Sequence, residues 1–471
     1  MKRVNMMIKI GILSFSDGRE RVHRNLAPAI EKSALRIQKV LEESGRVKVV
    51  PAKEIIWRHA QAREQAQYVT GQVVDGTILN LPVFAFPNLS RIAAQFAQGP
   101  LLAFSPRFGG LPGLGGMLGA SAALEQTGIP CEKLYGSLED QVVLDKLMDF
   151  CRSACAVNGL RGRVLGMIGG RSIGMVTGEA NPDLYASSFG LDVDHIDQLE
   201  IIRRSPQVSA DRVETALQWL KNKTKTIEYD SKKLSDETLR EQIRHYYATK
   251  SIIEDRQLDF VAVKCHYELS EYYSTQCLSA AFMNDPYDWD GRKEPFVFAC
   301  EADADAAVTM QILKLVSGKP VIFTDLRHYD SENNVMVFCN CGAMSTWYTK
   351  QSDVPEENLK EVSLAPVIEK YGGSGCHVRY IAGKSLMTFA RLYRKSSRFH
   401  MTIFTGENVE FPEEKLEETC PAWPHLFVKM SASPHELIPG LGSNHIHGVS
   451  GDYVSTLLKF CEMKGITAEV Y

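Results

Sequence analysis

Two acidic residues each follow a short apolar run in the second half of the chain. The run FVFAC is ended abruptly by Glu301, and the run VIF is followed by a threonine and then by Asp325. Two carboxylates that lie close together raise each other's pKa unless a cation neutralises them. We therefore interpret Glu301 and Asp325 as ligands of a divalent metal ion.

A predicted helix separates the two acidic residues. Apolar residues recur at helical spacing from Ala306 to Leu315, and Gly318 and Pro320 stop the pattern. We expect a strand–helix–strand unit whose two strands belong to one parallel sheet. Ligands of open α/β sheets bind at the carboxyl ends of the strands, where these acids would lie. Taken alone, an acid at such a place is more often a helix cap or turn residue, and Asp303 is expected to cap the helix.

A loop near the end of the sequence could supply a third ligand. The segment GSNHIHG places two histidines between glycines, more than a hundred residues after Asp325. An imidazole added to two carboxylates gives an oxygen-rich site. Such a site suits Mn²⁺ or Mg²⁺ better than a structural zinc, which prefers closed nitrogen and sulfur ligation.

The pattern of apolar runs predicts an α/β protein with three domains. Two doubly wound parallel-sheet (Rossmann-like) domains are expected, over residues 1–160 and 161–345, the second with the metal carboxylates. Beyond residue 346 the spacing becomes strand-like, until helical spacing returns at Tyr453 to Met463. An antiparallel β domain with one closing helix is therefore expected over residues 346–471.

The composition is that of an ordinary globular protein. The chain has 471 residues, 44% hydrophobic and 23% charged, with a net charge of −4. This charge gives no basic footprint for nucleic acid. No apolar run approaches the roughly 20 residues of a membrane span. The N-terminal segment lacks a cleavage site and is typical of a first strand, so we expect a cytoplasmic protein with no membrane partner.

Neither the cysteines nor the glycine-rich segment predicts a separate site. The eleven cysteines have no framework spacing, and Cys339-Asn340-Cys341 is a weak zinc signal for which we keep a structural interpretation. Six glycines lie between Gly109 and Gly119, but they follow the fourth predicted strand and lack a P-loop Lys. We expect them to allow close packing or contact with a sugar-sized ligand.

Four segments resemble the L-fucose and L-arabinose isomerase superfamily of metal-dependent aldose–ketose isomerases. They are GGRSIGM, the acidic turn after FVFAC, the turn TDLR, and the pair Asn444-His445. The resemblance runs through nearly the whole chain. Asp325 stands where arabinose isomerases use Glu, which favours the fucose branch.

The resemblance implies a metal centre and a mechanism. Glu301, Asp325 and His445 would be the metal ligands, with His447 as the alternative histidine. The metal would be Mn²⁺, with Mg²⁺ or Co²⁺ as alternatives. Glu301 and Asp325 would also transfer the protons of an enediol reaction on an open-chain sugar.

The substrate is open at this level, because the chain is shorter than typical bacterial L-fucose isomerases. L-Fucose or D-arabinose is the expected substrate, and an anionic hexose such as sulfoquinovose is the alternative. A non-catalytic sugar-binding protein is the alternative of another class. Candidate contacts to the sugar are Arg107, Arg171, Glu268, Trp423 and Asn444.

The resemblance also implies a homo-oligomer, trimer-based or hexameric, with shared active sites. The first domain of one chain would cover the site of another. The glycine-rich segment from Gly109 to Gly119 and the aromatic turn from Phe84 to Phe86 are the candidates to reach across.

Overall fold

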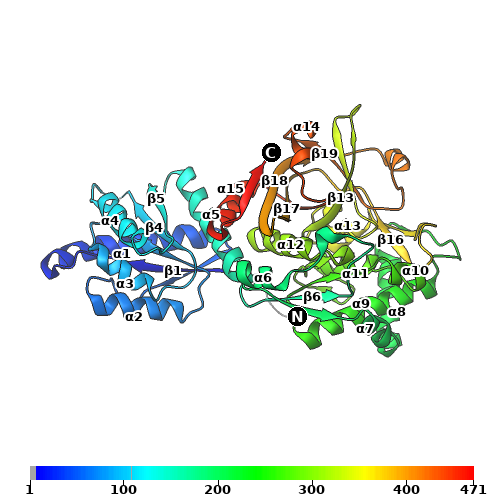
Figure 1. Ribbon diagram of the computed structural model, residues 1–471, viewed down its shortest axis with the longest axis horizontal. Helices are drawn as coiled ribbons and strands as arrows, with labels where there is room; N and C mark the ends of the chain where they lie inside the picture. The colour runs from blue at the N-terminus through cyan, green and yellow to red at the C-terminus, as the bar shows by residue number, and fades with distance from the viewer. Residues whose placement is uncertain (1–6, 108) are drawn as a thin grey trace. The chain divides into compact units, whose positions relative to one another are not determined.

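The computed structural model describes residues 7–107 and 109–471, which form two compact units (Figure 1). The N-terminal unit contains residues 7–159 and also residues 455–464. The C-terminal unit contains residues 160–454 and 465–471. A further division of the C-terminal unit near residue 345 stays a prediction. Among the described residues, no helix combines the length and apolar character needed to cross a membrane.

The N-terminal unit is built on a doubly wound parallel sheet, as predicted. Its strand order is β2-β1-β3-β4-β5, with every neighbouring pair parallel. The strands are β1 (Ile8–Ser14), β2 (Val47–Pro51), β3 (Gly76–Asn80), β4 (Leu101–Pro106) and β5 (Glu132–Gly136). The helices are α1 (Glu20–Glu43), α2 (His59–Thr70), α3 (Pro87–Ala94), α4 (Gly113–Glu125) and α5 (Gln141–Leu160).

Most of the glycine-rich segment is helical. Gly113 and Gly116 lie in α4, at the face that meets the chain leaving β3. A Cβ on Gly113 would lie 2.7 Å from the carbonyl oxygen of Leu81, and a Cβ on Gly116 would lie 2.4 Å from that of Val83. These glycines therefore allow close packing within the unit, as the sequence predicts.

Helix α15 (Val454–Lys464) belongs largely to the N-terminal unit, although the sequence pattern associates it with the C-terminal sheet. The hydroxyl of Ser153 in α5 donates a hydrogen bond to the carbonyl oxygen of Thr456 at 2.8 Å. Lys459 forms an ion pair with Glu132. A helix distant in sequence thus completes the N-terminal unit.

The C-terminal unit contains a second parallel sheet of order β12-β9-β6-β7. Its strands are β6 (Val164–Ile168), β7 (Asp192–Ile196), β9 (Phe260–Val263) and the short β12 (Phe298–Ala299). The α-helices of this part are α6 (Pro182–Phe189), α7 (Leu199–Arg204), α8 (Ala210–Lys223), α9 (Asp236–Arg256), α10 (Glu268–Tyr272), α11 (Cys277–Asn284) and α12 (Ala304–Ser317).

A mainly antiparallel sheet forms the other half of the C-terminal unit. Its order is β17-β20-β13-β14-β19-β18-β21, and β17 also pairs with β18, so six strands close into a barrel. The strands are β13 (Ile322–Asp330), β14 (Val335–Cys339), β17 (Ser385–Lys395), β18 (Arg398–Asn408), β19 (His425–Met430), β20 (His445–Ser450) and β21 (Thr467–Val470). The predicted antiparallel sheet is confirmed.

Short elements complete the C-terminal unit. A three-stranded sheet has the order β16-β15-β8, and β10 pairs with β11. These strands are β8 (Thr226–Ile227), β10 (Tyr287–Asp288), β11 (Gly291–Arg292), β15 (Ser363–Pro366) and β16 (Cys376–Arg379). The short helices are α13 (Pro355–Leu359), α14 (Pro434–Leu437) and the 3₁₀ turns η1 (Val176–Gly178), η2 (Ser205–Gln207), η3 (Cys300–Ala302), η4 (Thr346–Thr349), η5 (Glu413–Glu418) and η6 (Ile438–Gly440).

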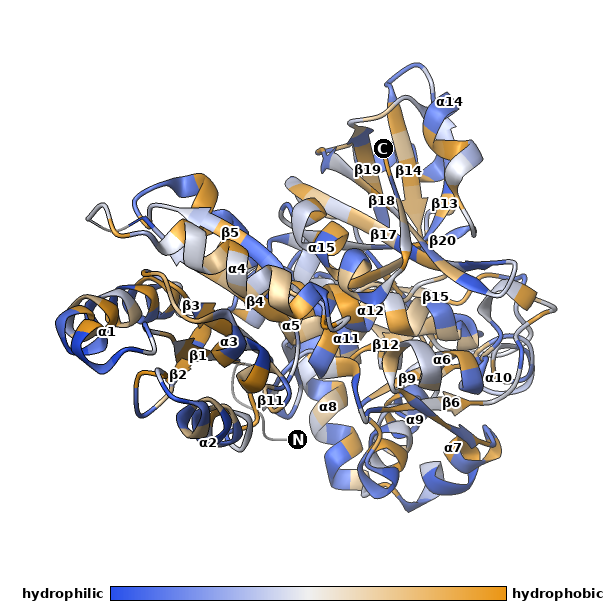
Figure 2. Ribbon diagram, turned by 60° about the vertical axis from the view of Figure 1, so that its left-hand side comes forward, coloured by the Kyte–Doolittle hydropathy of each residue, from blue (hydrophilic) through white to orange (hydrophobic). Residues whose placement is uncertain are grey.

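Helix α12 joins the parallel sheet to the barrel. It contacts β9 and β12 on one side and β17 and β20 on the other, and Figure 2 shows it between these strands with mainly apolar residues. The expectation that the strands before and after this helix share one parallel sheet is wrong. The strand after the helix, β13, pairs antiparallel with β14 and β20 instead. A helix buried on all sides can connect two sheets as well as it can cover one.

Candidate functional site

Glu301 leaves the parallel sheet through a strained turn. It follows β12 in the turn η3 with a left-handed backbone, φ 59° and ψ 21°, and Ala302 also has a positive φ of 50°. Non-glycine residues in this conformation cost free energy and cluster at functional sites. The turn leads into the N-cap of α12, where the carboxylate of Asp303 accepts a hydrogen bond from the backbone N–H of Ala306 at 2.8 Å. The carboxylate of Glu301 is buried.

Asp325 and His445 come from neighbouring strands of the barrel. Strands β13 and β20 are antiparallel, and their register places Asp325 directly opposite His445. Side chains opposite each other in an antiparallel pair project from the same face of the sheet. The amide of Asn444, one residue before His445, donates a hydrogen bond to Asp325 Oδ1 at 2.8 Å.

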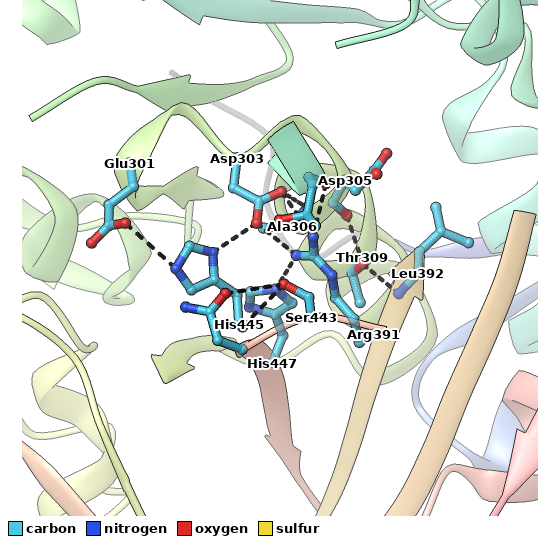
Figure 3. Close-up of polar contacts among 12 residues, drawn as sticks. Glu301, Asp303, Asp305, Ala306, Thr309, Arg391, Leu392, Ser443, His445 and His447 are labelled. Carbon is cyan, nitrogen blue, oxygen red and sulfur yellow. Dashed lines mark hydrogen bonds and ion pairs between the residues drawn. The ribbon is translucent and has the colours of Figure 1, made fainter. Parts of the chain in front are cut away.

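The imidazole of His445 lies among three carboxylates. Figure 3 shows two of them, Glu301 and Asp303, on either side of the ring. Its Nε2 is 3.5 Å from Glu301 Oε2 and 3.5 Å from Asp325 Oδ1. Its Nδ1 is 2.7 Å from Asp303 Oδ2. The three ligands predicted from the sequence therefore lie together, although they come from a parallel sheet and a barrel.

Asp303 connects His445 to a buried arginine. The guanidinium of Arg391, in β17, donates hydrogen bonds to Asp303 Oδ2 at 2.8 Å and Oδ1 at 3.2 Å. Arg391 is fully buried, and Asp303 is 1% exposed. Such a pair fixes the carboxylate, and the carboxylate in turn fixes the ring orientation and tautomer of the histidine.

The site requires positive charge beside its carboxylates. Burial alone would lower the pKa of His445, but contacts with Asp303 and Glu301 raise it to about 10. Burial, with the charge of Glu301, raises the pKa of Asp325 to about 6. Burial would also raise the pKa of Asp303, but the Arg391 guanidinium holds it well below its usual range. Two carboxyl groups, Glu301 and Asp325, thus face the same ring nitrogen of His445.

These residues fit a hard divalent cation. His445 Nε2 is buried and has no hydrogen-bond partner in the described part of the chain. Buried polar atoms are nearly always paired, so an orphaned nitrogen facing two carboxylates indicates that a ligand belongs there. Carboxylate oxygens with one imidazole nitrogen suit Mn²⁺ or Mg²⁺.

His447, the alternative histidine, lies elsewhere. It is on the same face of β20 as His445, but its Nε2 lies 3.2 Å from Arg391 Nη1. Burial, together with the charge of Arg391, holds the pKa of His447 well below its usual range. Of the two histidines, His445 is the one that faces Glu301 and Asp325.

The candidate sugar contacts are scattered. Asn444 reaches the site through Asp325. Trp423 is buried, and the guanidinium of Arg327 lies 5.6 Å from its ring centroid. The other three candidates form no hydrogen bond or ion pair with these carboxylates among the described residues. Arg171 is exposed and lies 3.3 Å from Glu179. Glu268 pairs with Lys264 in a pocket of about 600 Å³ at the ends of β6, β7 and β9. Arg107 is exposed and belongs to the N-terminal unit.

Four further residues lie around these carboxylates, and none of them is predicted from the sequence as a metal ligand. The sequence predicts Asp303 only as a helix cap, and it predicts no role for Arg391. An arginine inside the apolar strand LMTFARLYRK does predict a buried partner, but it does not say which one. His266 and Cys341 also lie beside Glu301, at 3.9 Å and 3.7 Å from Oε1. The Cys339-Asn340-Cys341 segment was a signal for the latter.

Comparison with protein families gives matches along most of the chain. Family models of L-fucose isomerase match three segments. The first N-terminal domain matches residues 7–162, the second N-terminal domain matches residues 263–318, and the C-terminal domain matches residues 338–470.

Individual relatives agree with these matches. L-fucose isomerase from Salmonella arizonae is 27% identical over 380 residues, which cover 71% of this chain and 63% of the relative. L-fucose isomerases from Citrobacter koseri and Klebsiella pneumoniae are each 26% identical over 377 residues, with the same coverage. The chain thus matches less than two thirds of the length of these relatives. A solute-binding protein from Burkholderia multivorans matches 67% of this chain and 95% of its own at 13% identity and a TM-score of 0.17, too low to compare folds.

Proposed function

The chain belongs to the L-fucose isomerase family, and on that premise we propose that it is a metal-dependent aldose–ketose isomerase acting on a free monosaccharide. The observation that supports this most strongly is the convergence of Glu301, Asp325 and His445. The orphaned Nε2 of His445 lies 3.5 Å from an oxygen of each carboxylate.

We propose Glu301, Asp325 and His445 as the ligands of Mn²⁺, with Mg²⁺ or Co²⁺ as alternatives. A cation held there would supply Lewis-acid polarisation of the sugar carbonyl and of the neighbouring hydroxyl. The oxygen-rich donor set favours Mn²⁺ and Mg²⁺ over structural zinc.

The carboxylates of Glu301 and Asp325 would move the protons. One takes the proton from C2 of the open-chain aldose and returns it to C1, and the other transfers the hydroxyl proton between O2 and O1. The net change is the conversion of an aldose into its ketose with no loss of atoms. Glu301 is buried and the Asp325 side chain is 27% exposed, so the two carboxylates differ in their access to water.

Asp303 and Arg391 would act as positioning residues. The hydrogen bond from His445 Nδ1 to Asp303 leaves Nε2 with its lone pair facing the two carboxylates. Arg391 keeps Asp303 ionised, so that it accepts this bond rather than donating one.

A neutral sugar of the L-fucose or D-arabinose type is the proposed substrate, on the strength of the family. An anionic hexose such as sulfoquinovose is the alternative, and it would need an unpaired cationic side chain near the sugar. The candidate Arg171 already faces Glu179 at 3.3 Å, which weakens that alternative. Trp423 and Asn444 are the proposed sugar contacts within the C-terminal unit, together with Glu268 if the sugar extends toward its pocket.

We also propose a cytoplasmic homo-oligomer, trimer-based or hexameric, in which the N-terminal unit of one chain helps to form the site of another. Arg107 in that unit would then be a contact to the sugar of a neighbouring chain. Analytical ultracentrifugation tests the assembly, and a protein that stays monomeric at assay concentration contradicts it.

The deciding experiment is a turnover assay on the purified full chain, stripped of metal and reloaded with Mn²⁺. L-Fucose, D-arabinose, other aldoses and sulfoquinovose are incubated in D₂O, and NMR follows ketose formation and deuterium at C1. We expect metal-dependent turnover of at least one sugar and its loss in Glu301→Gln. No turnover and no deuterium exchange with any sugar would reject the isomerase, and sugar binding without turnover would favour the non-catalytic alternative.

A further inference from the structure

The two oxygens of the Glu301 carboxylate face different sets of side chains. Oε2 lies toward His445, at 3.5 Å from its Nε2. Oε1 lies 3.7 Å from Cys341 Sγ and 3.9 Å from His266 Nε2. The ligand atoms of His266, Glu301 and Cys341 all lie within 4.8 Å of one another, and all three residues are buried. Glu301 therefore belongs to two groups of metal-ligating side chains.

The spacing of the second group suits a small tetrahedral ion. With a zinc–sulfur distance near 2.3 Å and zinc–nitrogen and zinc–oxygen distances near 2.0 Å, the ligand atoms of a tetrahedral site with one sulfur are roughly 3.3–3.5 Å apart. The observed distances from Glu301 Oε1, 3.7 and 3.9 Å, are only slightly longer. Small inward movements of the three side chains would complete three corners and leave the fourth for water.

The histidine of this group is already oriented for a metal. The hydroxyl of Ser270 donates its proton to the carbonyl oxygen of Tyr267 at 3.2 Å, so toward His266 it can only accept. His266 Nδ1 lies 2.9 Å from that hydroxyl, and with the hydroxyl oriented in this way Nδ1 carries the proton. The lone pair of His266 then resides on Nε2, the atom that faces Glu301.

The donor types of the two groups differ in softness. Glu301, Asp325 and His445 offer two oxygens and one nitrogen. His266, Cys341 and Glu301 offer nitrogen, sulfur and oxygen. Thiolate ligands select zinc and other thiophilic ions, whereas Mn²⁺ and Mg²⁺ prefer oxygen.

We propose that His266, Cys341 and Glu301 form a second cation site, selective for Zn²⁺ and similar thiophilic divalent ions, which shares the Glu301 carboxylate with the site at His445. On binding, the ion takes the place of the Cys341 thiol proton, which leaves to solvent. Glu301 then has both oxygens engaged and cannot exchange a proton with a sugar. Zinc would therefore inhibit the enzyme, a consequence that rests on the proposed function.

The site itself can be tested without any sugar, with Co²⁺ as the probe. Manganese-loaded full-length protein is titrated with Co²⁺ under reducing conditions, and thiolate-to-cobalt charge transfer is followed in the near ultraviolet. We expect the band in the wild type, its loss in Cys341→Ser and its retention in the control Cys277→Ser. The thiol of Cys277 contacts the Cys341 carbonyl oxygen at 3.3 Å but lies outside the group. No band in the wild type, or a band unchanged in Cys341→Ser, overturns the proposal.

A second variant guards against misfolding of Cys341→Ser. His266→Gln keeps the thiol and removes the imidazole, so the Co²⁺ concentration for half-saturation should rise by at least about tenfold. Circular dichroism confirms that the variant is folded. An unchanged half-saturation in folded His266→Gln contradicts the site.

Two further measurements separate this proposal from the isomerase. Asp325→Asn should lose Mn²⁺ binding but keep the thiolate band, and loss of the band as well would mean one site rather than two. In the wild type, Zn²⁺ should inhibit isomerisation, and Cys341→Ser should raise the half-inhibitory Zn²⁺ concentration at least about tenfold relative to its own zinc-free rate. A thiolate band without turnover of any sugar would retain the second site and reject the isomerase.

Discussion

The two sheets of the C-terminal unit hold their parts of the site by different means. Glu301, after the parallel sheet, is held by a left-handed turn at the N-terminus of α12. Asp325 and His445, in the barrel, are held by the register of two paired strands. Local backbone conformation places the first of the proposed ligands, whereas long-range strand pairing places the other two. Substitutions in the barrel should therefore affect metal binding by altering the contacts of β13 and β20. Substitutions at the turn should affect it by altering the start of α12.

The largest expected effect comes from the two histidines of β20. His445→Gln removes the imidazole that lies 3.5 Å from both carboxylates and should abolish Mn²⁺ binding, because the site loses its proposed nitrogen ligand. Equilibrium dialysis with Mn²⁺ measures this. The matched variant His447→Gln lies on the same face of the same strand and should still bind Mn²⁺. Equal losses in both variants would contradict the assignment.

The next largest effect is expected from removal of the buried Arg391 guanidinium, and it concerns the stability of the protein. Arg391→Met leaves Asp303 buried without its guanidinium partner, and loss of one member of a buried ion pair costs about 3–5 kcal/mol of unfolding free energy. Urea unfolding monitored by circular dichroism measures the loss. A change below about 1 kcal/mol, the range of exposed ion pairs, would mean that Asp303 finds another partner.

Two aspartates at the start of α12 allow the orientation of His445 to be tested separately from the local negative charge. Asp303→Asn should weaken Mn²⁺ binding by about 10–100-fold, because the hydrogen bond that orients His445 loses its charge. Asp305→Asn is the control, since Asp305 is equally buried but contacts Tyr185 and Arg394 instead. Isothermal titration with Mn²⁺ compares the two. A similar weakening in both variants would show that only the local charge matters.

The smallest effect is expected at the exposed partner of Asp325. Asn444→Ala removes one hydrogen bond to Oδ1, made by a side chain that water can replace. The dissociation constant for Mn²⁺ should rise by no more than about tenfold, less than in Asp303→Asn. The same titration measures it. A larger rise than in Asp303→Asn would mean that the barrel side depends on side-chain contacts more than on strand register.

Sequence patterns predicted which residues lie together better than they predicted the sheet that holds them. Glu301 and Asp325 stand out because each ends an apolar run. The pattern stops at Phe323, but β13 continues to Asp330. Its later residues, from Asp325 to Asp330, are partly or fully exposed. Polar residues that face solvent do not end an antiparallel strand. The apolar run was therefore only the buried part of a longer strand.

The surroundings of Glu301 could not be predicted for a different reason. His266 and Cys341 approach Glu301, and Arg391 approaches the neighbouring Asp303, from three separate segments that only tertiary packing brings together. A single buried histidine or cysteine in a sequence is more often part of the core. The left-handed backbone of Glu301 was also invisible, because glutamate gives no conformational signal of the kind that glycine gives.

The place of α15 affects how this protein can be divided. Within the described residues the chain passes between the two units at residues 159–160, 454–455 and 464–465, so three connections link them rather than one. A fragment ending near residue 159 would lack the helix that covers Ser153 and Glu132, and a fragment starting near residue 160 would have that helix with nothing to pack against. Proteolysis at any one connection would leave the pieces attached through the other two. A fragment designed to contain the N-terminal unit alone should therefore include α15, joined to the N-terminal segment as in a circular permutation.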